Sequence, residues 1–73
     1  MYDNKITGIA IRDLRHEADI SQEVLSGLAE VSRSHLSGIE NGSINASVDT
    51  LWKISKALEI RFSDLMRIVE EKL

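Results

Sequence analysis

Two helix-start signals lie close together in the middle of this chain, and their spacing limits its possible folds more than any other feature. Ser21 and Ser32 are both good N-cap residues, and the apolar residues that follow each of them recur at helical spacing. Only Glu30 and Val31 separate the two predicted helices. Because so short a connection is a tight turn, the two helices are expected to cross steeply.

The rest of the chain also favours helices. Proline is absent and no segment sustains an alternation of period two, so strands are not expected. The first helix is predicted over residues 6–18 and the fifth over residues 62–72. The third is predicted to end at Asn41-Gly42, and Ser47 is predicted to cap the fourth. We therefore predict an all-α fold, a compact five-helix domain that spans residues 1–73.

Two of the central helices have an apolar stripe that predicts which side faces the core. On the second helix the predicted inward residues are Leu25, Leu28 and Ala29. On the fourth they are Val48, Leu51, Ile54, Ser55 and Leu58. Trp52 is interpreted as a partly buried core residue.

Composition excludes several classes of protein. The chain has 73 residues, no cysteine and two histidines far apart in the sequence, so we expect no metal site and no cofactor. No apolar run approaches the ~20 residues that span a bilayer, and no signal peptide opens the chain, which favours a cytoplasmic protein. No nucleophile–base pair or phosphate loop is present, so an enzyme is not expected.

From Gly8 to Leu65 the sequence resembles the Cro and phage-repressor family of helix-turn-helix proteins, also described as the xenobiotic-response-element type. The resemblance rests on several short runs in the family's order and spacing. They are Gly8, Ile11-Arg12-x-Leu14-Arg15, Ile20-Ser21-Gln22-Glu23, Val31-Ser32-Arg33-Ser34, Ile39-Glu40-Asn41-Gly42, Ser47-x-x-Thr50-Leu51-x-x-Ile54 and Ala57-Leu58. It implies a lambda-repressor-like fold with the motif at about 21–41. It also implies a transcriptional regulator that binds double-stranded DNA and places a recognition helix, about 32–41, in the major groove.

The predicted third helix has a polar outer face of small side chains, which suits a surface that enters a groove. The resemblance places base contacts there, at Arg33, Ser34, Ser37 and Gly38. Arg33 is the strongest candidate, because a guanidinium group can bond guanine O6 and N7 together. The run from Ser37 to Glu40 also resembles restriction–modification controller proteins.

The resemblance implies phosphate contacts from three further residues. Gln22 begins the second helix, where amide donors and the helix dipole favour an anion. Asn41 and Ser43 follow the recognition helix, although Asn41-Gly42 would be expected there for helix termination alone. Arg15 and Glu40 are expected to form a structural ion pair that fixes the third helix on the first.

Three acidic residues stand where the family commonly has glycine. Asp19, Glu30 and Glu59 each lie near the end of a predicted helix, where a positive φ is natural and a non-glycine residue costs about 1 kcal/mol. The turn after the second helix therefore either carries strain at Glu30 or has a different geometry.

Partners are the least defined part of the prediction. Family members usually bind paired half-sites as dimers, and the fifth helix has more apolar residues than one small core needs. The predicted homodimer interface is Leu65, Met66, Ile68 and Val69. The formal net charge of −3 and the single cation between Ser21 and Ser47, Arg33, oppose DNA binding. They favour the alternative, a module that binds a partner protein such as a toxin or an antirepressor.

Overall fold

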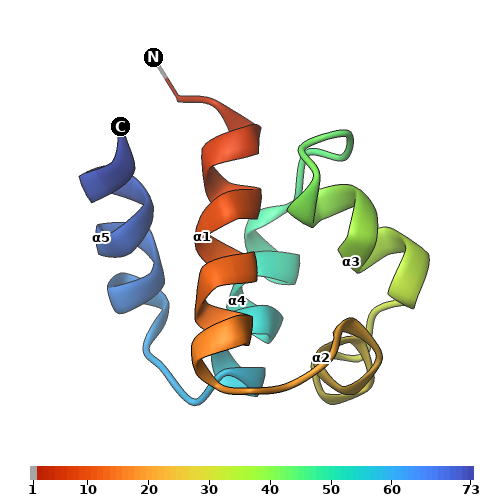
Figure 1. Ribbon diagram of the computed structural model, residues 1–73. Helices are drawn as coiled ribbons and strands as arrows, with labels where there is room; N and C mark the ends of the chain where they lie inside the picture. The colour runs from red at the N-terminus through yellow and green to blue at the C-terminus, as the bar shows by residue number, and fades with distance from the viewer. Residues whose placement is uncertain (1) are drawn as a thin grey trace.

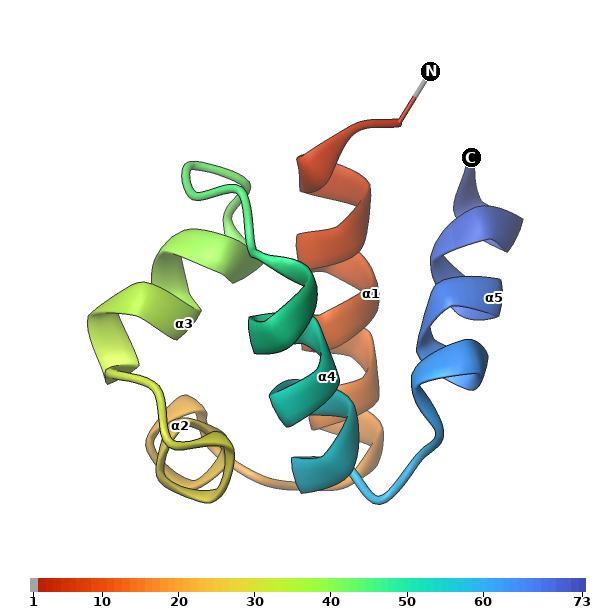
Figure 2. The same cartoon turned by 180° about the vertical axis from the view of Figure 1, so that it is seen from behind.

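The computed structural model describes residues 2–73, which form five α-helices and no strand (Figures 1 and 2). The helices are α1 (Asn4–Glu17), α2 (Gln22–Ala29), α3 (Arg33–Glu40), α4 (Val48–Ala57) and α5 (Phe62–Lys72). The predicted number, order and class of the elements are confirmed.

Side-chain caps start the helices where the sequence places them. The hydroxyl oxygens of Ser21, Ser32 and Ser47 each accept a hydrogen bond from the backbone N–H three residues later, at 3.1 Å in all three cases. α1 begins earlier than predicted, because the Asp3 carboxylate accepts from the Lys5 N–H at 2.9 Å. The three central helices are thus fixed at their first turn by local chemistry alone.

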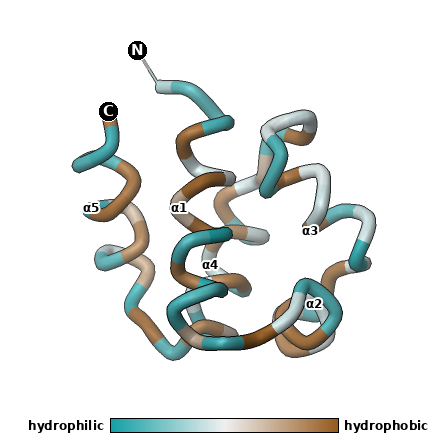
Figure 3. Tube along the Cα trace, in the orientation of Figure 1, coloured by the Kyte–Doolittle hydropathy of each residue, from teal (hydrophilic) through white to brown (hydrophobic). Residues whose placement is uncertain are grey.

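The long α1 is the centre of the bundle. It contacts α3 on one side and α5 on the other, while α2 packs on both α3 and α4 (Figures 1 and 2). Hydrophobic and hydrophilic residues alternate along the turns of the helices (Figure 3). The buried hydrophobic core is Ala10, Ile11, Leu25, Ala29, Leu36, Ile39, Leu51, Ile54, Leu65 and Val69.

Two residues predicted to face the core lie on the surface instead. Leu28 is 60% exposed and Val48 is 71% exposed. On α2 the inward position is taken by Ser26, which is 5% exposed and donates its hydroxyl to the Glu23 carbonyl at 3.0 Å. Ser26 and Leu28 lie at equal helical angles on either side of the buried pair Leu25 and Ala29, so periodicity alone does not choose between them. Val48 is the first residue of α4, at the end of its apolar stripe.

The three acidic residues near helix ends all adopt the left-handed conformation. The φ angles of Asp19, Glu30 and Glu59 are 58°, 58° and 60°. At Glu30 the backbone N–H donates to the Gly27 carbonyl, and the next N–H, from Val31, donates to the Ser26 carbonyl at 3.0 Å. This pair of bonds is a Schellman motif, which normally uses glycine at the left-handed position. Of the two turn geometries considered, the strained one is therefore present.

We expect Glu30→Gly to stabilise the fold by about 0.5–1 kcal/mol. Glycine removes the steric cost of the left-handed backbone, and the gain is limited because glycine also loosens the unfolded chain. Urea unfolding measures the change. Ala18→Gly is the matched control, because Ala18, the C-cap residue of α1, has an ordinary right-handed conformation with φ −79°, so glycine should destabilise there. A lower urea midpoint for Glu30→Gly contradicts the expectation.

Candidate nucleic-acid interface

A buried ion pair fixes α3 against α1. The Arg15 guanidinium donates from Nε to Glu40 Oε2 at 2.8 Å and from Nη2 to Glu40 Oε1 at 3.0 Å. Both side chains are almost fully buried, at 10% and 2% exposure. The hydrogen bonds to Glu40 raise the pKa of Arg15, which outweighs the lowering effect of burial. The pair lies where the sequence predicted it, and its two parallel bonds define the orientation of α3.

The start of α2 joins the same network. Gln22 Nε2 donates to Glu40 Oε1 at 3.1 Å, and Arg15 Nη1 donates to the Ile20 carbonyl at 3.0 Å. Thus one buried carboxylate links α1, α2 and α3. Sequence reasoning assigned Gln22 to phosphate alone and missed this bond. The bond leaves one N–H and the amide oxygen of Gln22 for a ligand.

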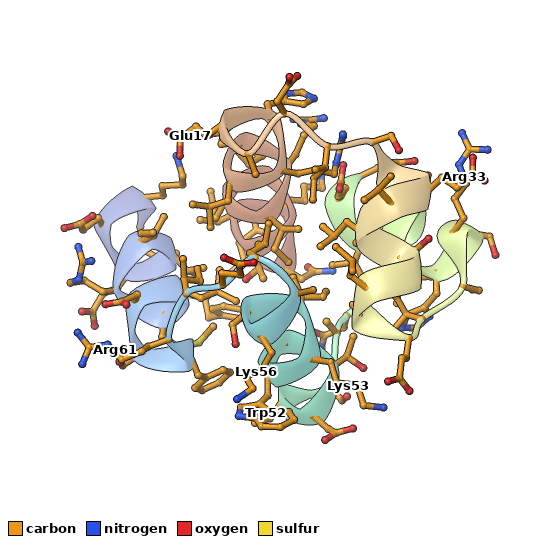
Figure 4. The ribbon with its side chains drawn as sticks, turned by 90° about the horizontal axis from the view of Figure 1, so that it is seen from below. Glu17, Arg33, Trp52, Lys53, Lys56 and Arg61 are labelled. Atoms are coloured by element: carbon orange, nitrogen blue, oxygen red, sulfur yellow. The ribbon has the colours of Figure 1, made fainter. Side chains whose placement is uncertain are left out.

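Three of the four predicted base-contacting residues share one surface with Gln22. Arg33 and Ser34 are exposed on the first turn of α3, and Ser37 is half-buried one turn later. Together with Gln22 they line an open hollow of about 380 Å³. In Figure 4 the Arg33 side chain points away from the body of the molecule. The crossing of α2 and α3 therefore brings these polar groups together, as the spacing predicts.

Gly38 does not lie on that surface, so its predicted outward placement is wrong. It is buried, and a side chain built on it would overlap the side chain of Ile44. The chain folds back after α3, and the N–H groups of Ser43 and Ile44 both donate to the Gly38 carbonyl, at 2.9 and 3.0 Å. Gly38 thus serves the close packing of the following loop.

That loop holds the remaining predicted phosphate contacts. Asn41 and Ser43 are both exposed, and the Asn41 side-chain oxygen accepts from the Ser43 N–H at 2.9 Å. Gly42 between them has a φ of +82°, and its carbonyl accepts from the side chain of Asn4 at 2.8 Å. Sequence reasoning missed this link to α1, because no local pattern pairs residues 38 positions apart.

Comparison with known proteins places this arrangement in a family. Residues 11–65 match the pattern of the family described as helix-turn-helix. The chain belongs to that family. It is 39% identical to control protein C.MunI of Mycoplasma sp over 74 residues, which covers 99% of this chain and all of the relative. It is 38% identical to control protein C.BamHI of Bacillus amyloliquefaciens, over 81% of this chain and 74% of the relative.

A solved structure of a controller protein is also similar to this chain. The crystal structure of the restriction–modification controller protein C.AhdI from Aeromonas hydrophila aligns with a TM-score of 0.82 at 34% identity. The alignment covers 85% of this chain and 94% of that chain. The resemblance to Cro-type helix-turn-helix proteins, and within them to controller proteins, is confirmed. The family consists of regulators and not of enzymes.

The predicted dimer surface on this helix-turn-helix domain needs correction. Leu65 is fully buried and Val69 is 4% exposed, and both belong to the core of the single chain, where α5 packs on α1 and α4. The prediction that these two residues face a second copy is wrong. Met66 and Ile68 are half-buried, so their part of the prediction stays open.

Residues 2–73 contain neither a cluster of metal ligands nor a membrane-spanning helix. No group of three or more potential metal ligands gathers in this part of the chain. No helix within it is long and apolar enough to cross a membrane.

We expect Arg15→Met to destabilise the domain by about 3–5 kcal/mol, because Glu40 would remain buried with its charge uncompensated. The double variant Arg15→Met with Glu40→Leu should be less destabilised than Arg15→Met alone, since it removes both charges and keeps apolar volume. Denaturant melts of the wild type, both single variants and the double variant form the required cycle. Additive losses would show that the two side chains do not interact.

Proposed function

We propose that this chain is a transcriptional regulator that binds double-stranded DNA with sequence specificity. The observation that carries the proposal is a cluster of polar side chains on one surface of a helix-turn-helix, formed by Gln22, Arg33, Ser34 and Ser37. The Arg15–Glu40 pair holds α3, which carries three of them, against α1. The relatives named as control proteins, and the controller protein of similar structure, support the same function.

In this proposal α3 enters the major groove and its first turn reads bases. Arg33 bonds a guanine through both donors, and Ser34 and Ser37 contact neighbouring base edges or phosphates. Gln22 holds a phosphate with its remaining N–H, because its other N–H is bonded to Glu40. Asn41 and Ser43 bind phosphates of the DNA backbone at the other end of α3.

The proposal includes a homodimer on a dyad-symmetric operator. The surface that supports it lies where α4 and α5 meet. We define the α4–α5 surface as Trp52, Ile60, Phe62 and Met66. Three of these residues line an open hollow of about 440 Å³ and Met66 follows Phe62 by one helical turn. Trp52 was expected to be a partly buried core residue, but 48% of its surface is exposed.

Charge on this surface is mixed, as a two-fold interface requires. Lys56 and Arg61 line the hollow together with Glu59. An interface between identical surfaces must be complementary to itself, so each charge needs its opposite within the same patch. In Figure 4 the labelled Trp52 and Lys56 lie at the lower side of the molecule, away from Arg33 at the upper right. A dimer formed there leaves both α3 surfaces uncovered.

The second candidate function is binding of a partner protein through the same α4–α5 surface. The exposed Trp52 and the net charge of −3 favour it. The two candidates differ in whether the chain associates with itself.

We expect Arg33→Ala to relax base preference at one position of each half-site, at a cost of about 1–3 kcal/mol per lost bidentate contact. Fragments selected from random duplexes by the wild type supply the operator, and binding to its single-base variants measures the preference. Arg67→Ala is the control, because Arg67 pairs with Asp64 and Glu71 on α5. An unchanged base preference in Arg33→Ala would remove the central claim.

We expect Trp52→Ser to weaken self-association by about 2 kcal/mol or more, roughly 30-fold in Kd, because a half-exposed aromatic residue is a typical interface anchor. Sedimentation over a concentration series measures it. Val24→Ser is the control, since Val24 is an exposed apolar residue of α2 that does not line the hollow. A wild-type chain that stays monomeric at high micromolar concentration contradicts the dimer and favours the partner-protein function.

A further inference from the structure

Most cations of this chain already have a partner within the molecule. Five of the nine lysine and arginine side chains lie within 3.6 Å of a carboxylate oxygen, and they are Arg15, Lys53, Arg61, Arg67 and Lys72. Lys56 Nζ lies 5.2 Å from the centre of the Trp52 ring. Within residues 2–73, that leaves Lys5, Arg12 and Arg33 without such a partner. Arg33 belongs to the interface described above, so Lys5 and Arg12 need an explanation.

Both residues lie on the side of α1 that borders α3. Gly8 contacts the end of α3 so closely that a side chain on it would overlap the Ile39 carbonyl oxygen. Arg12 comes four residues after Gly8 and three residues before Arg15, which bonds to Glu40. Arg12 is therefore the exposed residue between two contacts of α1 with α3. Lys5, seven residues earlier, has nearly the same helical angle.

The position of Lys5 is fixed by the turn after the recognition helix. A side chain on Gly42 would come within 3.1 Å of the Lys5 Cα and would overlap the Lys5 Cγ, so the stem of Lys5 lies on Gly42. The neighbouring Asn4 side chain donates to the Gly42 carbonyl at 2.8 Å. In Figures 1 and 2 the first turn of α1 lies beside the loop that follows α3. Lys5 thus stands next to Asn41 and Ser43.

We propose that Lys5 and Arg12 form a basic edge of the DNA interface and bind backbone phosphates of the duplex that α3 reads. This inference rests on the proposed function and extends its site to α1. Unpaired cations gain most from phosphate, because no internal ion pair has to break and the DNA releases condensed counterions. The sequence suggested that Arg33 was the only cation of the motif, but the fold adds two more from a distant segment.

The test compares the salt dependence of binding to a duplex of mixed sequence, about 24 base pairs long. Lys5→Gln with Arg12→Gln should reduce the slope of log K against log salt by about 1.8 per bound protomer, or about 0.9 for each lost phosphate contact. Glutamine keeps the Cβ and Cγ atoms that lie on Gly42. The matched control is Arg67→Gln with Lys72→Gln, which removes the same net charge from α5 and should leave the slope unchanged.

A charge-retaining variant, Lys5→Arg with Arg12→Lys, should keep the wild-type slope, and thermal melts by circular dichroism verify that each variant is folded. If the wild type does not bind the duplex even at about 50 mM salt, the proposed function itself fails. If the wild type binds and Arg33→Gln weakens it, but the slope of Lys5→Gln with Arg12→Gln stays within about 0.5 of the wild type, only the basic edge is overturned.

Discussion

The buried carboxylate of Glu40 is the point on which the arrangement of the first three helices depends. It receives two hydrogen bonds from Arg15 of α1 and one from Gln22 of α2, and it is itself the last residue of α3. No buried side-chain polar atom within residues 2–73 lacks a hydrogen-bond partner. An ion pair of this kind adds little net stability over an apolar pair, because both charges must leave water. Its effect is directional, since the two parallel bonds hold α3 in one orientation.

That orientation determines which polar groups can act together. Gln22 lies at the start of α2 and Arg33 at the start of α3, and a change in the crossing of these helices would separate them. The left-handed Glu30 sets the same crossing from the other end, because its Schellman motif turns the chain from α2 into α3. A strained backbone at this turn and a buried charge under α3 both cost free energy, and both define the surface that α3 presents.

The charge of the chain is less unfavourable to DNA than its total suggests. The net charge of −3 counts every side chain equally, but binding depends on which charges face the ligand. Glu40 is neutralised by Arg15 beneath the surface, and Asp64 and Glu71 are both paired with Arg67 of α5. A simple count along the segment from Ser21 to Ser47 therefore overstates the negative charge and misses the cations that α1 contributes.

The sequence predicted those features that local chemistry decides. Ser21, Ser32 and Ser47 cap their helices because a hydroxyl oxygen can reach the third following N–H in any context. At Glu30 the sequence left two turn geometries open, and the positive φ is the one that the family's glycine at this position favours. The Arg15–Glu40 pair followed from the resemblance alone, since nothing local joins residues 25 positions apart.

The errors occurred where neighbouring elements decide. Leu28 and Ser26 are both within reach of an inward face on a helix of eight residues, and the packing of α3 and α4 selects Ser26. Gly38 matched an outward polar face in helical periodicity, but the loop after α3 folds back and covers it with Ile44. Leu65 and Val69 looked surplus to a small core, yet α5 packs on both α1 and α4 and the two residues are part of the buried core.

These errors share one physical cause, and it bears on the site. Helical periodicity gives the relative angles of residues on one helix, but it does not give the direction in which the next segment leaves. The placement of Lys5 on Gly42 depends on such a direction, because the turn after α3 must fold back beside the start of α1. The residues proposed to read bases in α3 follow from the motif, whereas the cations proposed at its border come from the distant segment that packs there. In this domain that segment is the first turn of α1, which carries a cation.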